Sequence, residues 1–181
     1  KIYDFNQLPP SRQSKEAPQM IKNIFGKTGE NVWVEAPFHC DYGWNIEVGE
    51  NFYSNYNLTI LDVGKVTCGK NVQIAPNVSI YTAGHPVHPD SRNSGYEYGI
   101  PVTVGDNVWI GGNTVILPGV TVGSNVVIGA GSVVSKDIPD NTIAAGNPCK
   151  VIREITDEDR IYYFKKQKFD DEAWEEVKNK N

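Results

Sequence analysis

Between Val104 and Pro139 the chain repeats every six residues, and this period constrains the fold more than any other feature. An aliphatic residue opens each repeat, at Val104, Ile110, Ile116, Val122, Ile128 and Val134. Because β-branched residues favour a pleated surface, we expect short strands, and we expect the glycine that often follows to turn the backbone through angles that a Cβ would resist. Repeats of this kind form triangular coils whose stacking buries the aliphatic residues in one core. The pattern predicts an all-β fold, a parallel β-solenoid.

The same period is present upstream, with two-residue slips between three sets of residues: Val34, Cys40 and Ile46; Val48, Ser54 and Ile60; and Cys68, Ile74 and Ile80. Ile80 and Val104 are four periods apart, so the frame continues across the segment between them. We therefore expect an excursion loop at residues 81–102. The predicted divisions are a helical segment at 1–30, the solenoid at 31–151 and a helical extension at 152–181.

Both ends of the chain carry helix signals. Apolar residues from Ser14 to Phe25 follow helical spacing, and Gly26 supplies a stop. Thr156 and Asp159 have the spacing of a capping box, which predicts a helix through the sequence I-Y-Y-F-K-K. We expect these helices to cover the terminal coils. The chain begins at Lys1, so we also expect the N-terminal segment to be truncated.

Composition excludes several classes of protein. There are 22 acidic against 17 basic side chains, a net charge of −5, which argues against a general nucleic-acid surface. No apolar run approaches the ~20 residues that span a membrane. Cys40, Cys68 and Cys149 lack the spacing of a disulfide framework or a zinc knuckle, which favours a cytoplasmic location. We expect Cys40 and Cys68 to pack in the core, whereas nothing in the pattern explains Cys149.

His85 is the candidate catalytic residue. It lies in the excursion loop between Gly84 and Pro86, and imidazole is the side chain best suited to moving a proton near neutral pH. Two alternatives remain open from the residues alone. His85 could close a hydrogen-bonded turn, or it could pair with His88 in a metal site, for which zinc would need a third ligand such as His39.

Five strings in this order resemble the hexapeptide-repeat acetyltransferases of the galactoside and maltose O-acetyltransferase group. They are N-F-Y-S-N-Y-N at 51–57, I-A-P-N-V at 74–78, G-H-P-V-H at 84–88, N-V-W-I-G at 107–111 and A-A-G-N-P-C-K-V-I-R at 144–153. The resemblance extends from near Lys1 to about Phe169. It implies a left-handed parallel β-helix, a homotrimer with active sites between subunits, and acetyl-CoA as the acetyl donor.

The resemblance also implies roles for individual residues. His85 would take the proton from the acceptor hydroxyl as that hydroxyl attacks the thioester, without an acyl-enzyme intermediate. The Gly112 N–H would stabilise the oxyanion, and Asn55 would position the acceptor. No metal is required by this mechanism. The CoA contacts would come from small residues along the pantetheine arm and cations near the phosphates, at Gly112, Ala130, Ser135, Lys136, Lys150 and Arg153.

Two positions bear on the acceptor. Asp41 stands where the galactoside enzymes resemble one another in having Ser. Val63 stands where those enzymes have a second acidic residue after Asp62. Both changes resemble the maltose branch, whereas the tail from Arg153 resembles the galactoside branch. We therefore expect Asp41 and Asn55 to contact a sugar of either type. The competing classes are a γ-type carbonic anhydrase, which needs three convergent histidines, and a non-catalytic structural solenoid.

Overall fold

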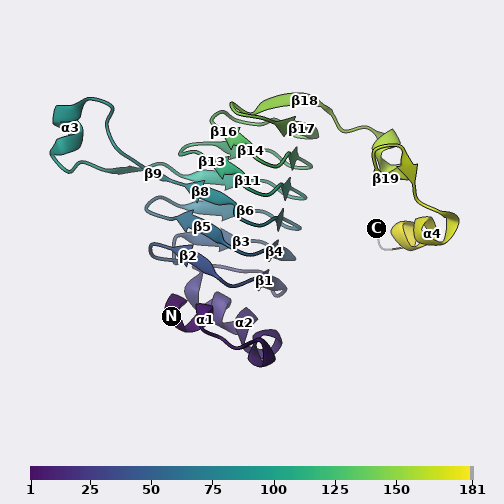
Figure 1. Ribbon diagram of the computed structural model, residues 1–181, viewed down its shortest axis with the longest axis horizontal. Coiled ribbons are helices and arrows are strands. Elements are labelled where there is room, and N and C mark those ends of the chain that lie inside the picture. Colours follow the sequence, from purple (N-terminus) through teal and green to yellow (C-terminus); the bar gives the residue numbers. More distant parts are fainter. Residues whose placement is uncertain (180–181) are drawn as a thin grey trace.

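The computed structural model describes residues 1–179, which form a three-sided prism with helices at its lower end (Figure 1). In each coil the chain passes along faces A, B and C in turn. Face A contains β1 (Val32–Val34), β4 (Phe52–Ser54), β7 (Gln73–Ile74), β12 (Trp109–Ile110), β15 (Val127–Ile128) and β17 (Thr142–Ala145). Face B contains β2 (Phe38–Cys40), β5 (Leu58–Leu61), β8 (Ser79–Tyr81), β13 (Val115–Ile116) and β16 (Val133–Val134). Face C contains β3 (Ile46–Val48), β6 (Val66–Cys68), β11 (Val102–Val104) and β14 (Thr121–Val122).

Neighbouring coils pair in parallel, and the repeat-opening residues stack on one another. On face A, for example, Ile110 pairs with Ile74 below it and with Ile128 above it. All three side chains are buried in the continuous core. The predicted all-β solenoid with a parallel β-helix is therefore confirmed. Its core is the stack of aliphatic layers that the six-residue period indicated.

The explanation expected for the glycines is wrong, because asparagine turns most of the corners. Asn107 and Asn125 have φ angles of 56° and 57°, whereas the glycines two positions earlier do not adopt positive φ. Those glycines are needed for close approach instead. A Cβ on Gly105 would lie 2.6 Å from the Ser124 Oγ and 2.8 Å from the Gly123 carbonyl carbon in the next coil.

A ladder of these asparagines follows corner CA, where face C meets the next face A. Each side-chain amide donates to the Oδ1 of the asparagine in the next coil, at 2.8–2.9 Å, through Asn51, Asn71, Asn107, Asn125 and Asn141. Asparagine tolerates the left-handed conformation and its amide can donate and accept at once. The corner is therefore held by side chains as well as by the strands.

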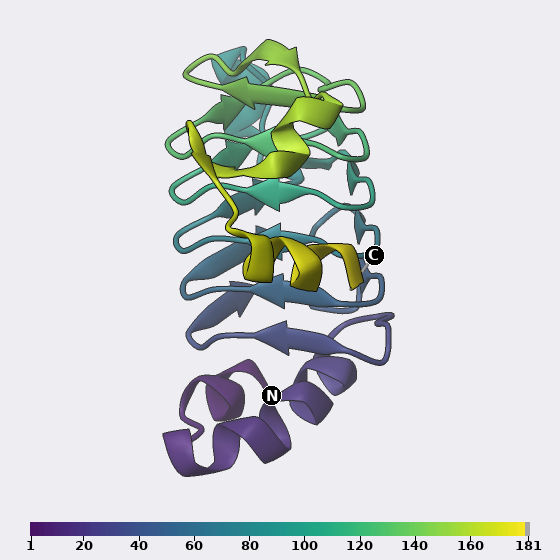
Figure 2. The ribbon, with the colours of Figure 1, turned by 90° about the vertical axis from the view of Figure 1, so that its right-hand side faces the viewer.

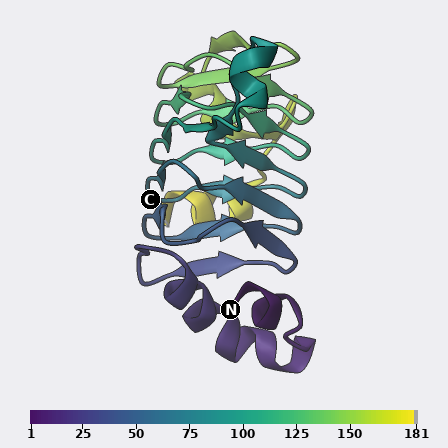
Figure 3. The same ribbon diagram turned by 90° about the vertical axis from the view of Figure 1, so that its left-hand side faces the viewer.

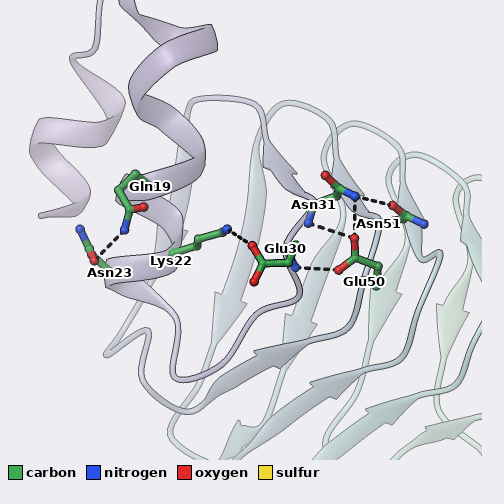
Figure 4. A network of polar contacts seen from close by, with 7 residues as sticks. All are labelled: Gln19, Lys22, Asn23, Glu30, Asn31, Glu50 and Asn51. Carbon is green, nitrogen blue, oxygen red and sulfur yellow. Dashed lines mark hydrogen bonds and ion pairs between the residues drawn. The ribbon is translucent and has the colours of Figure 1, made fainter.

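Helices α1 (Ile2–Asn6) and α2 (Pro10–Ile24) cover the first coil. The predicted helix is present and begins four residues earlier than expected, with Pro10 at its first turn, where proline is favoured. Lys22 of α2 lies 3.4 Å from the Glu30 carboxylate, and the Glu30 N–H donates to Glu50 at 2.6 Å (Figure 4). Asn31 links Glu50 to Asn51, so α2 is tied to the start of the asparagine ladder.

The C-terminal extension differs from the expectation. The capping box of Thr156 and Asp159 is present, but it opens the 3-10 helix η1 (Asp157–Ile161), and the aromatic run forms a hairpin of β19 (Tyr162–Phe164) and β20 (Gln167–Lys168). Consecutive aromatic residues favour strands over helices, which explains the difference. Helix α4 (Asp171–Asn179) follows, and the whole segment projects to one side of the prism (Figures 1 and 2).

The last coil is closed by a strand rather than by the expected helix. β18 (Lys150–Glu154) runs antiparallel to β17 at the end of face A. Cys149, the cysteine that the pattern did not explain, is buried immediately before β18, and its N–H donates to Val133. Burial raises the pKa of its thiol. The residue therefore seals the end of the core.

The other two cysteines differ in burial. Cys68 lies in the core as expected, whereas Cys40 is partly buried and packs against the core from its edge. Burial raises the pKa of both thiols to about 12, and for Cys40 the carboxylates of Asp62 and Asp41 contribute further. Within residues 1–179 no helix combines the length and the apolar character that crossing a bilayer requires.

Candidate active site

His85 lies at the base of the excursion loop, which leaves the prism where face B meets face C, here called corner BC (Figures 1 and 3). The base is a two-stranded ribbon of β9 (Ala83–Gly84) and β10 (Tyr98–Gly99), and the tip carries α3 (Pro89–Asn93). Gly84 is required here, since a Cβ would lie 2.5 Å from the Tyr98 hydroxyl. The ribbon thus presents His85 as the first residue beyond β9.

The His85 ring is exposed, and its Nδ1 lies 3.0 Å from the carbonyl oxygen of Tyr96. A carbonyl oxygen can only accept a hydrogen bond, so the hydrogen belongs to Nδ1. In the neutral ring Nε2 then keeps a lone pair, and no hydrogen bond to Nε2 is present within the described loop. This is the protonation pattern that a general base needs. The contact also provides the turn-closing role that the sequence left open.

His88 and His39 do not join His85. The His88 Nδ1 accepts from the Asp90 N–H at 3.2 Å and caps α3, and His39 lies on the outer surface of β2. Within residues 1–179 no group of three or more His, Cys, Asp or Glu side chains converges as metal ligands would. The described residues therefore lack the three convergent histidines that a γ-type carbonic anhydrase needs.

Asp41 lies on corner BC, two coils below the loop. The turn that carries it rests on Asp62, whose carboxylate has no exposed surface and accepts from the N–H groups of Asp41, Tyr42 and Gly43 at 3.0, 2.9 and 2.7 Å. Desolvation raises the pKa of the Asp41 carboxyl, with further contributions from Asp62 and from Glu97 of the loop. Asp41 is thus electrostatically coupled to the loop that holds His85.

Asn55, Gly112 and Ala130 lie on corner AB, where face A meets face B, in three different coils. Ser54, Ile74, Ile110 and Ile128 stack in register, so Asn55 stacks with Gly111 and Gly129, and Gly112 and Ala130 are one residue further along the corner. The Asn55 Oδ1 accepts from the Tyr56 N–H at 2.7 Å, as an ordinary corner residue would. The Gly112 N–H makes no hydrogen bond within residues 1–179, which leaves a donor available.

The predicted CoA residues fall at several places near the upper coils. Ser135 and Lys136 follow β16 on corner BC and are exposed. Lys150 and Arg153 lie on β18. Arg153 already has a partner, because its guanidinium forms two hydrogen bonds with the Asp159 carboxylate, at 2.6 and 2.7 Å. That contact, together with the Thr156 N–H, holds the pKa of Asp159 well below its usual range.

One chain therefore distributes the predicted site over two corners and β18, which carries Lys150 and Arg153. His85, Asp41, Ser135 and Lys136 belong to corner BC, and Asn55, Gly112 and Ala130 belong to corner AB. Face B separates the two, and its width of about five residues corresponds to roughly 15 Å. The structure does not bring His85 and Asn55 together within the chain.

Two features of this region escaped the sequence reasoning. The Tyr96 carbonyl that orients His85 is a backbone group, and no side-chain pattern could mark it. Asp62 is not marked by the six-residue period, although an acidic residue directly after the apolar strand 58–61 is a usable signal for a buried carboxylate.

The comparisons with known proteins agree with this architecture. The family described as "Bacterial transferase hexapeptide (six repeats)" matches residues 101–136. The galactoside O-acetyltransferase of Escherichia coli (strain K12) is 55% identical over 167 residues, which are 92% of this chain and 82% of that protein. The chain belongs to the hexapeptide-repeat acetyltransferases, in their galactoside and maltose O-acetyltransferase group.

Solved structures of acetyltransferases superpose closely on the chain. A galactoside acetyltransferase in complex with coenzyme A has a TM-score of 0.91 and 54% identity, and the match covers 93% of this chain and 84% of the other. A maltose O-acetyltransferase from Clostridium difficile 630 has a TM-score of 0.84 and 54% identity, with coverage of 86% and 83%. The hexapeptide-repeat acetyltransferase VCA0836 from Vibrio cholerae, complexed with acetyl coenzyme A, is 35% identical with a TM-score of 0.81 and coverage of 86% and 84%.

Proposed function

We propose that this protein is an acetyl-CoA-dependent O-acetyltransferase whose acceptor is a sugar hydroxyl, and that His85 is its general base. The observation that carries the proposal is the hydrogen bond from His85 Nδ1 to the Tyr96 carbonyl, which leaves Nε2 able to take a proton. The relatives named for galactoside and maltose acetylation, and the structures with coenzyme A and acetyl coenzyme A, support the substrates.

In the proposed reaction Nε2 takes the proton of the acceptor hydroxyl while the hydroxyl oxygen attacks the thioester carbonyl carbon. The Gly112 N–H stabilises the oxyanion that develops, which free backbone donors do effectively in sites that exclude water. The carbon–sulfur bond then breaks, and the His85 imidazolium returns the proton to the CoA sulfur. The acetyl group moves directly from sulfur to oxygen without an acyl-enzyme.

The division of the residues between two corners supports a homotrimer. A site that uses both His85 and Asn55 needs corner BC of one subunit beside corner AB of another. We therefore propose that each active site lies between subunits, with Asp41 and Asn55 toward the acceptor. Ala130, Ser135, Lys136, Lys150 and Arg153 face CoA in this arrangement. The three free thiols support a reducing, cytoplasmic location.

The test is CoA release on glucose, maltose and a thiogalactoside, measured for wild type and His85→Ala. General-base catalysis contributes about 10²- to 10⁴-fold, so the variant should lose that factor in kcat while its Kd for CoA is unchanged. His88→Ala is a matched control from the same loop, since it removes an exposed helix cap and should keep wild-type turnover. Wild-type turnover in His85→Ala would reject the assignment.

A further inference from the structure

An exposed pair of aromatic rings lies on corner BC next to Asp41. The centroids of the Tyr42 and Trp44 rings are 4.9 Å apart with an interplanar angle of 31°. Tyr42 is 48% exposed and Trp44 is 65% exposed. The pair therefore offers a large apolar surface to solvent rather than to the core, and aromatic surface of this kind gains most when a ligand covers it.

The backbone beneath the pair is held rigidly. Besides the N–H groups that Asp62 accepts, the Asn45 Nδ2 donates to the Asp62 carbonyl oxygen at 2.8 Å. Gly43 has a φ of +83°, and a Cβ there would lie 2.7 Å from the Ile24 Cγ2 at the end of α2. Since the turn is fixed on both sides, the rings are presented without the entropy cost of ordering a loose loop.

The pair also lies on the same corner as the loop that carries His85. Gly99 at the base of the loop packs so closely on Val63 and Gly64 that a Cβ would lie 2.7 Å from the Gly64 nitrogen. Desolvation, then the charge of Asp62 and that of Glu97, raises the pKa of Asp41, and the Tyr96 carbonyl oxygen lies 3.0 Å from the His85 Nδ1. Asp41, directly before Tyr42 in the chain, is therefore within electrostatic range of the loop segment whose Tyr96 carbonyl orients the proposed base.

We propose that Tyr42 and Trp44 form the platform on which the acceptor sugar stacks, and that Asp62 is a positioning residue that holds this platform. The inference rests on the proposed function and specifies its acceptor site. A pyranose ring has a face of C–H groups that packs on aromatic rings, and hydroxyls at its rim that a carboxylate such as Asp41 accepts from. Sites for small ligands combine an apolar wall with a few polar groups in this way.

The experiment measures acceptor KM, acetyl-CoA KM and kcat with methyl glucoside and a methyl galactoside. Trp44→Ala should raise the acceptor KM about tenfold, with the acetyl-CoA KM and kcat unchanged. Trp44→Phe keeps a ring and should recover most of the affinity. Phe164→Ala removes an aromatic residue of similar exposure, 55%, from β19 on the other side of the molecule and serves as the control (Figure 1).

Asp62→Asn should raise the acceptor KM in the same way while leaving the acetyl-CoA KM unchanged, a split that general unfolding would not produce. If Asp62→Asn does not fold, Trp44→Ala decides alone, because Trp44 is a surface residue. If wild type acetylates the sugar and the acceptor KM of Trp44→Ala is unchanged, the proposed platform is rejected and the proposed function still holds. A changed oligomeric mass in Trp44→Ala also overturns it, since the pair would then be a subunit contact.

A second readout separates the two proposals. Tryptophan fluorescence of the CoA-saturated protein is followed as methyl glucoside is added. If wild type acetylates no sugar but its fluorescence responds and that of Trp44→Phe does not, the platform is supported and the proposed function fails. If wild type neither acetylates nor responds, both fail.

Discussion

Arg153 and Asp159 form a bidentate ion pair, with N–O distances of 2.6 and 2.7 Å, just beyond the last coil. Arg153 is one of the cations assigned to CoA, so its charge is already partly compensated by a carboxylate that also caps η1. Phosphate would compete with Asp159 for the same guanidinium. Under the proposed role of Arg153, the pair would link CoA binding to the order of the C-terminal segment.

Arg153→Ala should weaken CoA binding about tenfold, because a charge-assisted contact with phosphate is lost. Asp159→Asn keeps the guanidinium and releases it from its partner, so its Kd for CoA should be no higher than that of wild type. Isothermal titration of each variant with CoA measures both. An unchanged Kd in Arg153→Ala would remove this residue from the binding site.

Acid should loosen the segment that follows Glu154. The Asp159 carboxylate has a lowered pKa in the folded state, chiefly through Arg153 and then the Thr156 N–H. A lowered pKa contributes stability above the unfolded value of about 3.9, and that stability is lost as the pH falls through the folded pKa. The loss begins once the pH falls below the unfolded value, so at pH 3 part of this stability is gone. In limited proteolysis of residues 155–170, the resistance of wild type relative to Asp159→Asn should therefore be smaller at pH 3 than at pH 7, and an equal advantage at both would contradict the linkage.

Gly84→Ala should reduce kcat by about tenfold or more, because overpacking of a tight contact costs about 1–3 kcal/mol and would here displace the ribbon that carries His85. The added Cβ would overlap the Tyr98 ring, whose nearest atoms lie 2.5–2.7 Å away. Removing that ring in the double variant Gly84→Ala/Tyr98→Ala should restore part of the lost rate. Steady-state kinetics of the single and double variants test this, and a single variant with wild-type kcat would show that the ribbon adjusts freely.

The asparagine ladder predicts a difference between two substitutions at Asn107. Asn107 has a φ of 56° and makes side-chain bonds of 2.9 Å to both Asn71 and Asn125. Asn107→Ala loses both hydrogen bonds and places alanine, whose Cβ is strained there, in the left-handed region, so it should lower the free energy of unfolding by about 2 kcal/mol. Asn107→Gly loses the same bonds without that strain and should lower it by about 1 kcal/mol. Denaturant unfolding measures the two free energies. Equal losses would show that the conformation does not contribute.

Prediction of the fold from the sequence succeeded where the signal was local and repeated. The layers at Ile74, Ile110 and Ile128 followed from the six-residue period, and so did the position of the loop. The capping box of Thr156 and Asp159 predicts a helix through the aromatic run, but the strand preference of Tyr162, Tyr163 and Phe164 prevails and the run forms a hairpin. The corner glycines were identified correctly, yet their role depends on the neighbouring coil, which lies 18 residues away in the sequence for Gly105 and Gly123.

The sequence by itself determined the solenoid, the loop at residues 81–102 and His85 as the candidate base. These signals are local, since a six-residue period and a histidine between Gly84 and Pro86 can each be recognised within a short stretch of sequence. Only the tertiary structure decided that Asp62 is buried under the turn of Asp41, that Asp159 pairs with Arg153, and that His85 and Asn55 lie on different corners. Each of these depends on which coils lie beside one another. Burial, hydrogen bonds and charge pairing are properties of that arrangement in space and not of the order of residues along the chain.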